Sequence, residues 1–145
     1  MQVTDFLSIT EQEEIVLAIQ KAEQNTSGEI RIHIEKRKIK DLFHRATRVF
    51  SFLKMHRTSL RNGVLIYINL DCNTIVILGD KGINTKVPSD FWEHIKDDII
   101  KSFKDQDYKE GLINGVLAVG KELKTYFPFN GKKDNELPDE ISFGS

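Results

Sequence analysis

The sequence predicts an α/β fold: a three-layer α/β/α sandwich in which a small mixed β-sheet is flanked by about four helices. Three observations support this prediction. Segments with helical apolar spacing alternate along the chain with short β-branched runs, in the order α-β-α-β-β-α-α. One of those runs is apolar on both faces, as expected of a central strand that is covered on both sides. The length of 145 residues fits one domain.

The first elements are a helix over residues 8–24 and a strand over residues 29–35. Ser8 and Glu11 are spaced to form a capping box at the start of the helix. The strand alternates isoleucine with polar residues, so we expect one buried face and one polar face. Asp41 is placed to cap a second helix that ends near residue 53.

The second half begins with two strands. Residues 64–68 form the strand that is apolar on both faces, and residues 74–78 form a third strand that pairs with it as a hairpin. Two helices follow. One is expected from Ser89, which can cap it, to residue 103, and the other starts at Asp107, which is spaced three residues from Glu110 as in a capping box.

Residues 1–127 therefore make one domain, and the polar residues 128–145 are expected to form a flexible C-terminal tail.

Composition excludes several classes of protein. The chain has 21 basic and 22 acidic side chains and a net charge of −1, which argues against a strongly basic nucleic-acid binder. A single cysteine, Cys72, excludes an intrachain disulfide and a cysteine-rich zinc site. No apolar run approaches the roughly 18 residues of a membrane span. The first residues lack the features of a signal peptide, so we expect a cytoplasmic, monomeric protein.

Basic residues concentrate in the middle of the chain, where residues 31–62 carry ten basic and two acidic side chains. A turn after the first strand contains Lys36, Arg37, Lys38 and Lys40. This run could bind an anionic membrane surface, a nucleic acid or an acidic partner. A solvated basic turn is the simpler interpretation, because the aromatic residues that interleave with basic ones in single-strand binders are missing.

Topology predicts that three loops meet at one edge of the sheet. The first two strands form a βαβ unit and must be parallel, whereas the hairpin makes the third strand antiparallel. The loops that precede the first two strands and follow the third therefore lie together at one end of the sheet. They are residues 27–29, 58–63 and 79–83, and we call this end of the sheet the three-loop edge. Glycine beside Asn or Asp is also ordinary turn chemistry.

The three-loop edge offers oxygen atoms of the kind that Ca²⁺ and Mg²⁺ prefer. The candidate metal ligands are Glu29, Asn62 and Asp80. Other candidate binding residues in the same loops are Gly28, Thr58, Arg61, Gly79, Lys81 and Gly82.

Three motifs along the chain carry a family resemblance. They are Arg61-Asn62-Gly63-Val64-Leu65-Ile66, Ile77-Leu78-Gly79-Asp80-Lys81-Gly82-Ile83, and Asp107-Tyr108-Lys109-Glu110-Gly111-Leu112 with Gly115-Val116. In order and spacing they resemble the TPM domain family over roughly residues 5–127. The resemblance implies a sheet flanked by helices and divalent-cation binding. The family includes an acid phosphatase of the thylakoid lumen, which makes phosphatase activity a second expectation.

The chain departs from the family pattern near the proposed site. The family usually has Asn where this chain has Arg61, and a Glu after the glycine turn where Asn84 follows Ile83 here. Both departures make Asp80 the most important remaining carboxylate. Many family members also have a signal peptide and a membrane anchor, and neither is expected here.

We therefore expect a divalent-cation-binding module that contacts an unknown protein partner. The alternative is a metal-assisted acid phosphatase at the same edge, in which Arg57, Arg61 and Lys81 hold phosphate and Asp80 acts as a base or metal ligand. The four histidines do not cluster in the sequence, so we expect solvated surface positions for His33, His44, His56 and His94.

Overall fold

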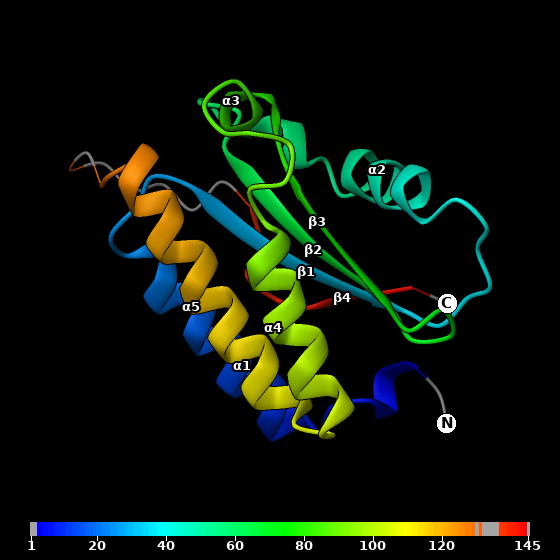
Figure 1. Cartoon of the computed structure of the whole chain (residues 1–145). Coiled ribbons are helices and arrows are strands. Elements are labelled where there is room, and N and C mark those ends of the chain that lie inside the picture. The colour runs from blue at the N-terminus through cyan, green and yellow to red at the C-terminus, as the bar shows by residue number, and fades with distance from the viewer. Residues whose placement is uncertain (1–2, 130, 132–136, 145) are drawn as a thin grey trace.

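The structure, a computed structural model, describes residues 3–129, 131 and 137–144. Helices and strands alternate along these residues much as the sequence predicted. Their order, drawn in Figure 1, is η1 (Val3–Asp5), α1 (Ile9–Glu23), β1 (Glu29–Glu35), α2 (Leu42–Phe52), η2 (Met55–Arg57), β2 (Gly63–Asn69), β3 (Thr74–Gly79), α3 (Lys81–Asn84), α4 (Glu93–Lys104), α5 (Tyr108–Tyr126) and β4 (Ser142–Phe143).

The strands form one mixed sheet in the order β3-β2-β1-β4. β1 and β2 run parallel, with Glu29 opposite Gly63 and Glu35 opposite Asn69. β2 and β3 form an antiparallel hairpin. The parallel pair and the hairpin are both as the sequence predicted, so the chain places the three loops at one edge.

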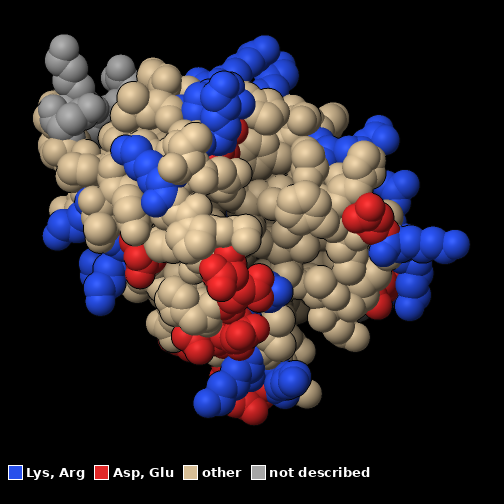
Figure 2. All heavy atoms as spheres, turned by 45° about the horizontal axis from the view of Figure 1, so that its top comes forward, with Lys and Arg blue, Asp and Glu red and all other residues tan. Residues whose placement is uncertain are grey.

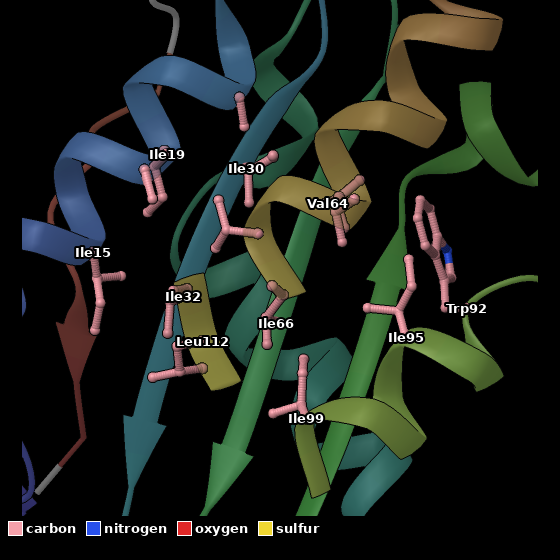
Figure 3. Packing of buried hydrophobic residues seen from close by; sticks show 14 of the residues in the cluster. Ile15, Ile19, Ile30, Ile32, Val64, Ile66, Trp92, Ile95, Ile99 and Leu112 are labelled. Atoms are coloured by element: carbon pink, nitrogen blue, oxygen red, sulfur yellow. The ribbon is translucent and has the colours of Figure 1, made fainter. Parts of the chain in front are cut away.

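Helices cover both faces of the sheet, which confirms the predicted three-layer sandwich. Figure 1 shows α1, α4 and α5 together on one face and α2 on the other. The larger core lies under the three helices, where Ile15 and Ile19 of α1, Ile99 of α4 and Leu112 of α5 meet the isoleucines of β1 and β2 (Figure 3). These four side chains are at most 1% exposed. Burying one such side chain stabilises the fold by roughly 1.5–3 kcal/mol.

Local capping signals place the starts of two helices. The Ser8 hydroxyl accepts from the Glu11 backbone N–H at 3.1 Å, and the Glu11 carboxylate accepts from the Ser8 N–H at 2.9 Å. This is the predicted capping box. Asp41 caps α2, since its carboxylate accepts from the His44 N–H at 3.0 Å.

Two other helix starts differ from the prediction. α4 begins at Glu93 rather than at Ser89, because Pro88 opens a stretch of turns in which the Phe91 N–H donates to the Pro88 carbonyl at 3.2 Å. α5 begins at Tyr108 as expected, but the Asp107 side chain makes no capping hydrogen bond. Its ψ of 63° differs from the extended backbone that side-chain capping requires.

The polar face of β1 is buried, contrary to the prediction. Glu29 and Glu35 are 0% exposed and His33 is 4% exposed. Their burial is possible because α2, β2 and the C-terminal segment supply hydrogen-bond partners. The expectation of a solvated His33 was therefore wrong. The other three histidines are exposed, as predicted: His44, His56 and His94.

The C-terminal segment also differs from the predicted flexible tail. Residues 137–144 lie against the domain, and β4 pairs in parallel with β1. Leu137 is 5% exposed, and the Gly144 N–H donates to the Ile34 carbonyl at 2.9 Å. The open edge of β1 provides the partner that the sequence pattern did not reveal. Residues 130, 132–136 and 145 of the predicted tail lie outside the described residues.

Within the described ranges, no helix combines the length and the apolar character needed to cross a membrane.

Candidate functional site

Backbone hydrogen bonds join the three loops of the three-loop edge, which lies beside α3 in Figure 1. The Glu29 N–H donates to the Asn62 carbonyl at 3.4 Å, and the Asp80 N–H donates to the Gly63 carbonyl at 2.9 Å. The Gly82 N–H donates to the Arg61 carbonyl at 2.9 Å. The loops therefore meet as the topology predicted.

Asp80 occupies the centre of this edge and is 5% exposed. It caps the short helix α3, because Oδ1 accepts from the Lys81 backbone N–H at 2.8 Å. Arg61 holds both carboxylate oxygens, with Nε 2.8 Å from Oδ2 and Nη2 3.1 Å from Oδ1. Burial alone would raise the pKa of Asp80, but the hydrogen bonds from Arg61 and Lys81 outweigh it and lower that pKa. Asp80 is therefore an ionised carboxylate with a cationic partner.

Arg61 also contacts a histidine that the sequence placed only on the surface. Its Nη2 lies 3.3 Å from His56 Nδ1, and His56 Nδ1 lies 3.6 Å from Asp80 Oδ1. Arg61 adopts a left-handed φ of 51°, which turns the chain sharply before Asn62. No local pattern marks His56 for this position, since its contacts are made across the loop.

Asn62 is 1% exposed and holds two of the loops together. Its backbone N–H donates to Thr58 Oγ1 at 3.1 Å, and its Nδ2 donates to Ser27 Oγ at 3.3 Å. Its Oδ1 atom is buried and has no hydrogen-bond partner among the described residues. A buried amide oxygen of this kind needs an explanation, because native structures contain few of them.

Gly82 allows α3 to approach the preceding loop. A Cβ atom at this position would lie 2.2 Å from the Leu60 carbonyl oxygen and 2.6 Å from that of Arg61. Only glycine fits so close to backbone atoms. The remaining predicted loop residues frame the same edge: Gly28 precedes β1, Gly79 ends β3 and the exposed Lys81 begins α3.

The Glu29 carboxylate has a hydrogen-bond partner in the C-terminal segment. It accepts from the Leu137 backbone N–H, at 3.1 Å to Oε2 and 3.3 Å to Oε1. Over the part of the chain that the structure describes, no group of three or more His, Cys, Asp and Glu side chains could hold a metal ion. A cation at this edge would therefore rely on Asn62, Asp80 and backbone carbonyls.

Surface charge around this end of the molecule is mixed. Figure 2 turns the α3 end of Figure 1 forward and shows basic side chains spread around the outline, with acidic side chains gathered toward the lower middle. The basic run of Lys36, Arg37, Lys38 and Lys40 follows β1, at the opposite end of the sheet, and its members are exposed. The two predicted surfaces are thus separate.

Comparison with known proteins identifies relatives of the chain. A model of the TPM domain matches residues 1–122. The solution structure of the BA42 protein from the psychrophilic bacterium Bizionia argentinensis is 48% identical, with a TM-score of 0.89 and 96% of each chain covered. The N-terminal domain of a P. gingivalis protein shares the fold, with 20% identity, a TM-score of 0.67 and coverage of 84% of this chain and 79% of that one. No curated protein matches. The chain belongs to the TPM domain family.

Proposed function

We propose that this chain is a regulatory, divalent-cation-binding TPM domain in which Ca²⁺ or Mg²⁺ binds at the three-loop edge. The observation that carries the proposal is the buried Oδ1 atom of Asn62, which has no hydrogen-bond partner among the described residues. Leaving such an oxygen unsatisfied costs about 1–3 kcal/mol. A cation that takes this oxygen as a ligand would remove the penalty, and amide oxygens are suitable ligands for both ions.

Asp80 supplies the negative charge in this proposal. Its lowered pKa keeps the carboxylate ionised, and its loop is bonded to the first residue of β2. Backbone carbonyls near Gly79 and Gly82 are the further ligands. Glu29, the third ligand expected from the sequence, is not assigned as a ligand in this proposal, since its buried carboxylate accepts from the Leu137 N–H.

Arg61 competes with the cation for Asp80. Both of its hydrogen bonds to the carboxylate would have to be released or shared when a cation binds. We therefore expect a dissociation constant of about 10⁻⁴–10⁻³ M, as in low-affinity calcium modules. Binding would free the Arg61 guanidinium and order the loops, and the altered edge would then contact an acidic segment of a partner protein.

An amide NMR titration with CaCl₂ and MgCl₂ tests the proposal on the unmodified chain, Asp80→Asn and Arg61→Asn. The unmodified chain should show shifts confined to residues 27–29, 58–63 and 79–84, and Asp80→Asn should lose them. Arg61→Asn should bind more tightly because it frees Asp80. Asparagine tolerates the φ of 51° at this position and is the residue that the family usually has there.

Asp97→Asn, on the exposed surface of α4, is the matched control because it removes the same charge away from the edge. It should titrate like the unmodified chain. Absence of shifts at millimolar cation, or equal shifts in Asp80→Asn, would contradict the proposal.

The second candidate function is a metal-assisted acid phosphatase at the same edge. It is favoured by the cationic and imidazole groups of Arg61 and His56, which lie beside Asp80 and could hold a phosphoryl group. A phosphomonoester assay with added Ca²⁺ or Mg²⁺ tests it on the same proteins. Activity that disappears in Asp80→Asn supports this candidate, whereas no activity, or activity that survives the substitution, rejects it.

A further inference from the structure

A serine, a histidine and a glutamate form a chain of hydrogen bonds near the C-terminal end of β1, away from the three-loop edge. β4 places Ser142 beside His33 in the parallel register, so their side chains leave the same face of the sheet. Ser142 Oγ lies 2.9 Å from His33 Nδ1, and His33 Nε2 lies 3.2 Å from Glu35 Oε1. Ser142 is half-buried, whereas the other two residues are almost fully buried.

The donors around Glu35 fix the direction of this chain of hydrogen bonds. Arg45 donates to both carboxylate oxygens, at 2.8 and 2.9 Å, and the Tyr67 hydroxyl donates to Oε2. Burial alone would raise the pKa of Glu35, but the hydrogen bonds from Arg45, Tyr67 and His33 lower that pKa to about 2. The ionised carboxylate can only accept a hydrogen bond. His33 Nε2 therefore carries a proton, and this N–H donates a hydrogen bond to Glu35.

His33 is therefore a base that faces Ser142. Burial lowers its pKa, with the cations Arg45 and Arg31 acting in the same direction and Glu35 in the opposite one. In the neutral ring Nε2 holds the only proton, so Nδ1 presents a lone pair and the Ser142 hydroxyl donates to it. The Tyr67 ring stacks on the His33 ring with centroids 6.0 Å apart, and the charge of Glu140 acts on Arg31.

In a second serine–histidine pair of the same molecule, the hydrogen bond runs in the opposite direction. Ser51 Oγ lies 3.2 Å from His56 Nε2, while Arg61 Nη2 lies 3.3 Å from His56 Nδ1. Arginine can only donate, so Nδ1 of a neutral His56 accepts and Nε2 holds the proton. His56 thus donates to Ser51 and cannot remove its proton, which makes this pair an internal control.

Arg31 adds a group that can stabilise negative charge. It lies two residues before His33 on the same face of β1, and its charge acts on His33. Its Nε atom is buried and makes no hydrogen bond within the described ranges. An unpaired guanidinium N–H is a donor of the kind that can stabilise a developing oxyanion.

From this geometry we propose that Ser142 is a nucleophile for carboxylic esters, with His33 as its base, Glu35 as the residue that positions His33, and Arg31 as the oxyanion donor. Ser142 Oγ bonds to the ester carbonyl carbon and its proton passes to His33 Nδ1. The carbon–oxygen bond to the leaving alcohol then breaks, and the alcohol takes the proton from His33. Water attacks the acyl-serine by the same route, which releases the acid and restores the hydroxyl.

A fluorophosphonate probe and p-nitrophenyl acetate test this proposal on the full chain. The probe should form a phosphonyl adduct that peptide mass spectrometry maps to Ser142, with loss of fluoride. Because only neutral His33 can act as base, the labelling rate should rise with pH as His33 loses its proton, measured on its Cε1–H NMR signal. His33→Gln should slow ester hydrolysis by about 10²–10⁴-fold.

Ser51→Ala is the matched control and should label and hydrolyse like the unmodified chain. Ser142→Ala should lose both reactions while the Gly144 amide signal stays in place, which shows that β4 still pairs with β1. The adduct mapped on the unmodified chain does not depend on the folding of any variant. Absence of an adduct at Ser142, or a labelling rate that does not change as His33 loses its proton, would overturn the proposal.

Discussion

Glu35 shows how a residue can contradict its own sequence pattern. Alternation with isoleucine puts it on the polar face of β1, yet it is 0% exposed. Its donors come from α2, β2 and β1 itself, and two of them, Arg45 and Tyr67, are distant in sequence. Periodicity predicts which face a side chain occupies, but partners assembled by the fold decide whether a charge on that face is buried.

Arg45→Ala should destabilise the protein strongly, because it leaves the buried Glu35 without its cation. Loss of one partner from a buried ion pair costs about 3–5 kcal/mol, and we expect the lower end because the Arg45 side chain is 26% exposed. Urea unfolding at neutral pH measures the loss. Arg48→Ala removes the same side chain from an exposed position on α2 and should change stability by less than about 0.5 kcal/mol. Equal effects of the two substitutions would contradict this assignment.

At the scale of elements, local signals predicted those parts of the fold that depend on neighbouring residues. Ser8 and Asp41 cap their helices, and β2 is buried along its whole length, as its two apolar faces indicated. β4 could not be predicted in this way. It has two residues within a polar segment, and its pairing depends on the open edge of β1, more than a hundred positions earlier in the chain.

Truncation after Gly131 should therefore destabilise the domain, although it removes residues that the sequence assigned to a tail. The shortened chain loses the buried Leu137 side chain, which contributes roughly 1.5–3 kcal/mol, and the donor to Glu29. The midpoint of urea unfolding reports the change. A chain that lacks only Ser145 is the control and should unfold like the full chain. An unchanged midpoint after the longer deletion would show that β4 adds nothing to stability.

The sequence predicted which loops form the candidate site, but not how their side chains pair. The βαβ unit and the hairpin were enough to bring Asn62 and Asp80 to one edge. The same reasoning could not anticipate that Leu137 would donate to Glu29, or that Arg61 would turn onto Asp80. Topology specifies which backbone segments meet, whereas the pairing of side chains depends on rotamers and on segments that arrive later.

At the scale of the whole molecule, two buried carboxyl groups give stability opposite dependences on pH. Glu35 has its pKa lowered from 4.5 to about 2, so its contribution is present above pH 4.5 and is lost as pH falls toward 2. Burial raises the pKa of Glu23 from 4.5 to about 9, with Asp139 and Glu29 adding to the rise. The contribution of Glu23 is complete below pH 4.5 and is lost as pH rises toward 9. Taken alone, these two groups lower stability as pH falls from 4.5 toward 2 and as pH rises from 4.5 toward 9.

Glu23→Gln should remove the loss of stability that Glu23 causes as pH rises from 4.5 toward 9. The amide can accept from the Ile30 N–H, as Glu23 does at 2.8 Å, and can donate to Asp139 without ionising. At pH 7 the variant should be at least about 1 kcal/mol more stable than the unmodified chain, because its unfolded state no longer gains from ionisation. Urea unfolding between pH 5 and about 9 should show a flatter profile. Glu13→Gln changes an exposed residue of the same helix, so its free energy of unfolding should depend on pH as in the unmodified chain. If the stability of Glu23→Gln still fell steeply with pH, another group would control the fall.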